Sequence, residues 1–211
     1  MPENAAGPEP LDREALDAAA RALRQGQAIV LPTDTVYGVA VLLSTPRATQ
    51  VLSTLKGRSA EQALAVLIAS LEQAEFLTEP PSPIAQRLMA AFWPGPVTLV
   101  LRRRRELRSL ELGGDGSTIG LRWPRHALVC ELASRLGPLV TTSANRHGQA
   151  TPVTASEAAE ALAGPVAAVI AGGVVAGLAS TVIDCAADVP RVLREGTVTR
   201  AQISAELGAD S

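Results

Sequence analysis

The spacing of apolar and polar residues along this chain predicts both helices and short strands. Residues 11–25 have apolar side chains at helical spacing, and Gly26 follows as a typical helix end. Further helices are expected where this spacing returns, near residues 46–55, 71–76, 84–92, 126–136, 155–163 and from 199 onwards. Short continuous apolar runs predict strands at residues 28–31, 39–43, 64–69, 97–101, 118–123, 139–142, 166–170, 181–185 and 191–194.

Strands and helices mix without strict alternation, which favours an α/β fold built on a twisted mixed sheet with flanking helices. The 211 residues suffice for one such domain with a sizeable core and are few for two. The sequence shows no internal repeat and no linker. We therefore expect a flexible N-terminal tail at residues 1–10 and a single domain over residues 11–208.

Composition limits the core and the metal chemistry. Hydrophobic residues make up 47% of the chain but aromatic ones only 2%, so the core must consist of Ala, Val, Leu and Ile. Cys130 and Cys185 lie far apart and the chain has only two histidines, which gives no plausible set of zinc ligands. We expect both thiols to be small buried hydrophobes in a reducing compartment.

The N-terminal segment and the net charge indicate location and partners. The first residues are polar and rich in proline, unlike a signal peptide, and no run approaches the about 20 apolar residues of a membrane span. The net charge of −2 argues against a protein that coats nucleic acid. These features predict a soluble cytoplasmic protein without membrane contact.

The common nucleotide-binding motifs are absent, including the P-loop and a GxGxxG after a strand, so a nucleotide site would have to be assembled from several loops. One candidate is Lys56-Gly57-Arg58, at the end of a predicted helix, which holds the only lysine of the chain. Lysine could offer a point charge and arginine a bidentate fork to a polyphosphate. Alternatively, the two cations complement the helix dipole and the glycine caps the helix.

Two segments have side chains that suit an amino acid ligand. The loop 32–38, PTDTVYG, carries Thr35 and Tyr37 between two apolar strands. It could bind the polar groups of an amino acid, or it is a turn that satisfies its own backbone. Arg122 stands in the apolar strand 118–122, where a cation suits an α-carboxylate or a phosphate, unless it is an ordinary edge-strand arginine.

Two further segments suit phosphate or RNA. Ser143 and Asn145 leave a strand two residues apart, so their side chains point the same way and could hold a phosphate, a ribose or a base. They are also ordinary turn formers. The arginine run at 102–105, with Arg108, could meet RNA phosphates or attract ATP, but a solvated loop or a guarded sheet edge is the more usual role of such a run.

Seven segments in this order resemble the YrdC/Sua5 family across about residues 14–200: PTDTVYG, KGR, FWPGPVTLVL, TIGLRWP, TSANRHGQ, GLASTVID and VLREG. The resemblance implies a twisted, mixed α/β sheet around a deep, positively lined cavity. It also implies that L-threonine, bicarbonate and ATP give L-threonylcarbamoyl-AMP and pyrophosphate, with Mg²⁺ assisting. A separate threonylcarbamoyl transferase complex then acts on adenosine 37 of tRNA, and a weak contact with tRNA or RNA is compatible with this role.

The resemblance also assigns roles residue by residue. Those implied for ATP are Lys56, Arg58, Gln62, Thr118, Ser143, Asn145 and Arg194. Those implied for threonine are Thr35, Tyr37, Arg122 and Ser180. Lys56 and Arg58 are expected to be catalytic, because N-carboxy-threonine attacks the α-phosphorus of a polyanion and the protein contributes mainly positioning and charge neutralisation. No protein nucleophile and no protein-bound metal are expected.

The chain departs from the family pattern at a few positions. Ser59 follows KGR where the family often has proline, residues 60–63 lack its usual polar and proline residues, Ala171 replaces a common acidic residue, and residues 195–197 read EGT. Two alternatives remain open: a carbamoyl-adenylate-forming module like that of hydrogenase maturation, and a non-catalytic RNA-binding module. The net charge and the intact KGR and SAN segments speak against the second.

Overall fold

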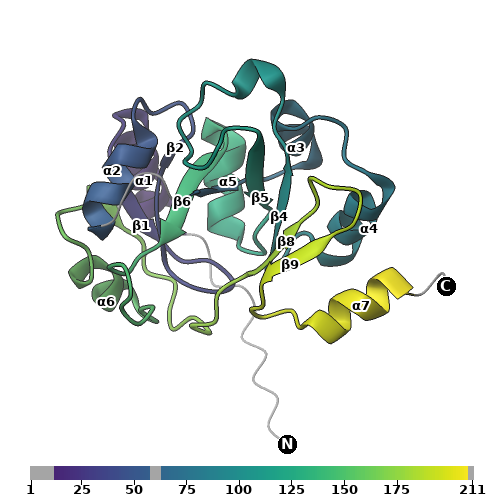
Figure 1. Ribbon diagram of the computed structural model, residues 1–211. Helices are drawn as coiled ribbons and strands as arrows, with labels where there is room; N and C mark the ends of the chain where they lie inside the picture. The colour runs from purple at the N-terminus through teal and green to yellow at the C-terminus, as the bar shows by residue number, and fades with distance from the viewer. Residues whose placement is uncertain (1–11, 58–62, 209–211) are drawn as a thin grey trace, which may run out of the picture.

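The computed structural model describes residues 12–57 and 63–208, which form one mixed β-sheet with helices packed against it (Figure 1). The sheet in these residues has the strand order β7-β1-β2-β6-β3-β5-β4-β8-β9. The strands are β1 (Ile29–Leu31), β2 (Gly38–Leu42), β3 (Ala65–Leu67), β4 (Val97–Arg102), β5 (Thr118–Arg122), β6 (Leu139–Ser143), β7 (Ala168–Val169), β8 (Thr181–Asp184) and β9 (Arg191–Arg194). The helices are α1 (Arg13–Arg24), α2 (Ala48–Lys56), α3 (Leu71–Leu77), α4 (Pro83–Phe92), α5 (Ala127–Leu136), α6 (Ala155–Glu160), α7 (Arg200–Gly208) and the short 3₁₀ helix η1 (Arg105–Leu107).

The sheet is mixed in direction, as the sequence predicts. The pairs β1–β7, β3–β5 and β4–β8 are parallel, and the remaining neighbours are antiparallel. Strand positions agree with the apolar runs, although the run at 166–170 pairs only over Ala168–Val169. The expected tail at residues 1–10 lies outside the described residues, so the domain boundary stays a prediction.

The strands in the middle of the sheet are buried on both faces, which explains why they read as continuous apolar runs. In β2 every residue is buried. Ala40 and Leu42 pack in a cluster with α1 and α5, whereas Val39 and Val41 pack in the larger cluster that includes α2, α3 and α4. Residues two apart therefore share a face, and each face has its own hydrophobic core.

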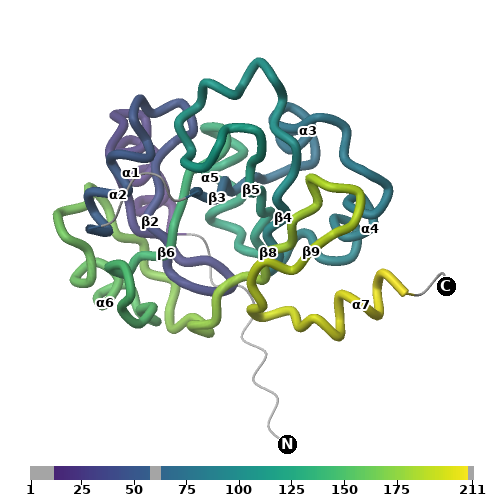
Figure 2. Tube along the Cα trace, viewed as in Figure 1, coloured from purple at the N-terminus to yellow at the C-terminus, as the bar shows by residue number. Residues whose placement is uncertain are grey.

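One long connection shapes the region where the cavity lies. Residues 103–117 join β4 to β5, and in Figure 2 this segment arches over the top of the molecule towards α2. Thr49 of α2 donates a hydrogen bond from its hydroxyl to Glu111 O, and Leu64 N donates to Leu112 O at 2.9 Å. The connection is thus held against α2 and the start of β3.

No helix in the described part of the chain is long and apolar enough to cross a membrane.

Candidate active site

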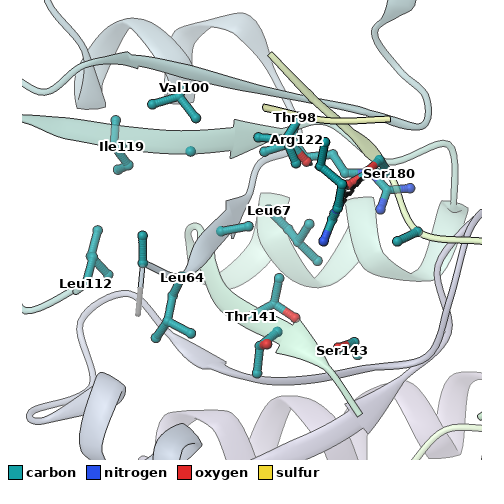
Figure 3. Close-up of a pocket in the computed structure, with 18 of the residues that line it drawn as sticks. Leu64, Leu67, Thr98, Val100, Leu112, Ile119, Arg122, Thr141, Ser143 and Ser180 are labelled. Carbon is teal, nitrogen blue, oxygen red and sulfur yellow. Dashed lines mark hydrogen bonds between the residues drawn. The ribbon is translucent and has the colours of Figure 1, made fainter. Parts of the chain in front are cut away.

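A cavity of about 430 Å³ lies between strands β3, β4, β5, β6 and β8 (Figure 3). Its two ends differ in chemistry. Thr98, Arg122 and Ser180 gather at one end, and Leu64, Leu112 and Ile119 lie at the opposite end in the view of Figure 3. The cavity therefore offers a polar compartment continuous with an apolar one.

The cavity is positively charged, as expected. Its lining includes Arg103, Arg122 and Arg194, and no carboxylate lines it among the described residues. Burial lowers the pKa of each guanidinium. At Arg122 the ion pair with Asp34 opposes this lowering of the pKa, and the nearby charge of Arg194 adds to it. Because arginine keeps its proton even when buried, these side chains remain cations and favour an anionic ligand.

Three hydrogen-bond acceptors of the protein hold the guanidinium of Arg122 in place. Its Nη2 donates to Asp34 Oδ1 at 2.6 Å, its Nη1 to Thr35 Oγ1 at 2.7 Å and its Nε to Gly95 O at 3.1 Å. Only 5% of Arg122 is exposed. Two of the five guanidinium N–H groups remain for a ligand, on a side chain whose orientation is already set.

Ser180 links the polar end of the cavity to two neighbours. Its hydroxyl lies 2.9 Å from Thr98 Oγ1, and its backbone oxygen accepts a hydrogen bond from Arg194 Nη2 at 2.9 Å. Ser180 stands directly before β8, which is parallel to β4, so these side chains come from adjacent strands of the sheet. The structure thus brings together two predicted residues, Ser180 and Arg194, whose sequence context alone is unremarkable.

Two residues predicted to hold threonine lie behind the cavity wall. Thr35 and Tyr37 are fully buried, and neither belongs to the lining. The Tyr37 hydroxyl donates to Gly173 O at 2.8 Å and accepts a hydrogen bond from Gly172 N at 3.0 Å. Tyr37 therefore fixes the loop that leads to Ser180 rather than facing the cavity.

Lys56 holds the Ser143–Asn145 segment in place. Its ammonium donates to Ser143 O at 2.6 Å, to Asn145 O at 2.6 Å and to Asn145 Oδ1 at 2.9 Å. Gly57 ends α2 in the left-handed conformation with a φ of 62°, as the capping interpretation predicts. Lys56 is only 3% exposed and is not part of the lining, whereas Ser143 is. The Lys56 ammonium thus holds the cavity wall at Ser143 in position and does not project into the cavity.

The remaining predicted residues have three different outcomes. Thr118 lines the cavity at the start of β5. Asn145 is buried beside Lys56 and donates from Nδ2 to Gln149 O at 2.7 Å, outside the lining. Arg58 and Gln62 lie outside the described residues, and so does Ser59, which replaces the family's proline.

The arginine run is not uniformly solvated, which corrects the preferred sequence interpretation. Arg103 is buried and lines the cavity, whereas Arg102 and Arg105 are exposed. Sequence reasoning missed Thr98 in the lining, and it included Thr33 only as part of the candidate loop 32–38. Thr98 had a usable signal, because it is a polar residue inside an apolar strand and therefore marks one face of that strand.

The two thiols differ in burial. Cys185 is buried, and burial raises its pKa to about 12, so it is a neutral thiol. Cys130 is only half-buried, less than expected for a core residue. Within residues 12–57 and 63–208, no group of three or more histidine, cysteine, aspartate and glutamate side chains could hold a metal ion.

A single mixed sheet with a cationic cavity at its centre defines an α/β protein suited to a small anionic ligand. Residues 21–196 match the Sua5/YciO/YrdC family model, which carries the description telomere recombination. The chain belongs to this family.

Two similar proteins illustrate the relationship in sequence. A protein of Mycobacterium tuberculosis named putative threonylcarbamoyl-AMP synthase is 36% identical over 191 residues, which cover 90% of this chain and 88% of the relative. The threonylcarbamoyl-AMP synthase of Bacillus subtilis is 36% identical over 192 residues, which cover 90% of this chain. The match spans only 56% of the length of that second relative.

Solved structures show the same fold. Sua5 of Pyrococcus abyssi in complex with L-threonine superposes with a TM-score of 0.86 at 32% identity, over 95% of this chain and 59% of that one. YciO of Escherichia coli superposes with a TM-score of 0.80 at 27% identity, over 90% of this chain and 93% of that one. Full-length HypF in a phosphate- and nucleotide-bound form superposes with a TM-score of 0.75 at 20% identity, over 86% of this chain and 29% of that one, and shares the fold.

Proposed function

We propose that this protein is a threonylcarbamoyl-AMP synthase. It converts L-threonine, bicarbonate and ATP into threonylcarbamoyl-AMP and pyrophosphate, and a separate transferase complex passes the threonylcarbamoyl group to adenosine 37 of tRNA. The observation that carries the proposal is the oriented guanidinium of Arg122, which lines a cationic cavity large enough for substrates. The synthases among its relatives and the threonine complex of Pyrococcus abyssi Sua5 support the same assignment.

Threonine binds at the polar end of the cavity. The two N–H groups that Arg122 does not use on the protein receive the α-carboxylate, since charge-assisted hydrogen bonds to a fixed fork are strong. The hydroxyls of Thr98 and Ser180 are close enough to bind its remaining polar groups. Thr35 and Tyr37, which do not line the cavity, contribute indirectly. Thr35 orients Arg122, and Tyr37 holds the loop before Ser180.

ATP extends from the polar end towards the apolar one. Arg194, Ser143 and Thr118 line the path and suit its phosphates and ribose. Lys56 and Asn145 fix Ser143. Arg58 and Gln62, which lie outside the described residues, keep the ATP-binding role that the family resemblance implies. The apolar end, lined by Leu64, Leu112 and Ile119, accepts the purine ring.

The reaction needs positioning and charge more than a protein nucleophile. The carbamate oxygen of N-carboxy-threonine forms a bond to the α-phosphorus of ATP, and the bond to pyrophosphate breaks. The cationic wall stabilises the negative charge that develops on the phosphoryl oxygens and on the leaving group.

Mg²⁺ is the remaining component of the proposal. Since no carboxylate among the described residues lines the cavity, the side chains present fit an ion that arrives on the phosphates of ATP rather than one held by the protein. When bound there, Mg²⁺ neutralises phosphate charge.

The reaction belongs to the cytoplasm, where the substrates and tRNA occur. The exposed arginines of the 102–105 run suit a weak tRNA contact.

Pyrophosphate release tests the proposal. Purified protein is supplied with ATP, Mg²⁺ and bicarbonate, and each amino acid is added in turn. We expect release that requires both L-threonine and bicarbonate, with less from L-serine. Release without any amino acid, or equal release with all of them, would contradict the assignment.

A further inference from the structure

Arg103 is a buried arginine of the cavity to which the proposed function gives no role beyond its share of the positive charge. It directly follows β4, is 1% exposed and belongs to the cavity lining. Its Nε donates to Thr118 O at 3.1 Å and its Nη1 to Leu110 O at 2.8 Å. The guanidinium therefore lies between the start of β5 and the connection 103–117, and both contacts fix its plane.

The charge of Arg103 is only partly compensated. None of the ion pairs among residues 12–57 and 63–208 includes it, although the charge of Asp115 opposes the lowering of its pKa by burial. Its Nη2 donates to no acceptor in this part of the chain. Nη2 is not one of the fully buried side-chain atoms that lack a partner, so it keeps an accessible surface as a residue of the cavity lining. Such a donor favours a ligand that brings an acceptor.

The position of Arg103 in the cavity indicates which part of the ligand it contacts. Thr118 and Leu110, which hold the guanidinium, are next to Ile119 and close to Leu112 in the sequence. Ile119 and Leu112 line the apolar end, opposite the polar end with Arg122 and Ser180 (Figure 3). Phosphates suit the polar end, so the ligand group at the apolar end is a flat, weakly polar ring. The ring nitrogens of a purine are acceptors for N–H donors.

We propose that Arg103 is a nucleotide-binding residue, whose Nη2 donates a hydrogen bond to a ring nitrogen of the adenine of ATP. This inference rests on the proposed function, since it requires ATP in the cavity with its base at the apolar end. It gives the enzyme a contact that selects a purine with a free ring acceptor at that position.

Binding of ATP to the full chain, measured by calorimetry with Mg²⁺ present, is the first test. Arg103→Gln removes the charge and the fork, and we expect about tenfold weaker binding, the effect of one charge-assisted hydrogen bond. Arg102→Gln is the matched control: the neighbouring arginine is exposed, contacts Ala186 O at 2.7 Å and lies outside the lining. We expect the control to bind ATP like the original protein. Equal ATP binding by the original protein and Arg103→Gln would overturn the inference.

Deaza analogues separate direct contact from support of the fold. The original protein and Arg103→Gln are titrated with 1-deaza-, 3-deaza- and 7-deaza-ATP. We expect the original protein to lose affinity for one analogue, and Arg103→Gln to bind that analogue and ATP equally. A variant that loses the same factor with ATP and all three analogues would show that Arg103 only holds the connection 103–117, and the inference would be wrong.

Two further outcomes keep the inference separate from the proposed function. If the original protein binds no ATP at all, both fail. If it binds ATP but shows no preference among the analogues, only the role of Arg103 fails. Circular dichroism checks the fold of each variant, and Arg103→Lys, which keeps the charge but not the fork, takes the same tests if Arg103→Gln does not fold.

Discussion

Replacing Lys56 by methionine removes the ammonium that joins the end of α2 to the end of β6. Methionine keeps the length and the apolar stem of the side chain, so the main change is the loss of hydrogen bonds. Three of these are shorter than 3 Å and reach Ser143 O, Asn145 O and Asn145 Oδ1. In Lys56→Met these oxygens lose their charged donor.

The expected loss of stability follows from these contacts. A buried acceptor left without its partner costs about 1 kcal/mol or more. Asn145 Oδ1 keeps the hydrogen bond from Ser143 Oγ at 2.6 Å, so the two backbone acceptors left unpaired give about 2 kcal/mol. The Ser143–Asn145 segment should also move, and a displacement of about 1 Å in a positioned site can lower the rate about a hundredfold. We expect at least about a tenfold loss in kcat/KM for ATP, the effect of one charge-assisted hydrogen bond.

Urea unfolding and pyrophosphate release measure the two effects separately. Arg24→Met is the control, since it removes the same charge from an exposed position in the last turn of α1. We expect the control to stay within about 0.5 kcal/mol of the original stability, as surface changes usually do. Original stability together with original turnover in Lys56→Met would refute the role given to the ammonium.

Three further changes test other parts of the account. In Tyr37→Phe the loop loses its bonds to the Tyr37 hydroxyl, so we expect a several-fold higher KM for threonine and faster amide exchange at Gly172; unchanged values would contradict this role. In Arg122→Gln, threonine binding measured by calorimetry should weaken about tenfold or more, because the charged fork is lost, and undiminished binding would place the carboxylate elsewhere. The pKa of Cys185 is raised from 9.0 to about 12 in the folded protein, so the unfolded chain releases its proton first and stability should fall as pH rises from 9 to 12. Urea unfolding should show a shallower fall in Cys185→Ala, and an identical slope would argue against this origin.

The sheet could be predicted from the sequence because its signals are local. Central strands buried on both faces appear as continuous apolar runs, and β2 shows why, with Ala40 facing one core and Val39 the other. Arg122 was recognisable as a candidate because a cation inside such a run needs a reason to be there.

The orientation of the site residues could not be predicted from local pattern. Tyr37 turns away from the cavity because its hydroxyl meets the backbone of Gly172 and Gly173, which are far away in the sequence. Arg103 is buried while Arg102 and Arg105 are exposed, since the connection after β4 folds back and supplies acceptors only to Arg103. Tertiary packing determines these hydrogen-bond partners. A run of like charges in the sequence does not indicate which of its members finds them.

Direct identification of the product tests the central claim. The protein is incubated with ATP, Mg²⁺, L-threonine and ¹³C-labelled bicarbonate, and the nucleotide products are separated and analysed by mass spectrometry. The account predicts threonylcarbamoyl-AMP that carries the label in its carbamoyl carbon and depends on threonine. ATP consumption that yields only AMP or ADP, or an adenylate without the labelled carbon, would contradict it.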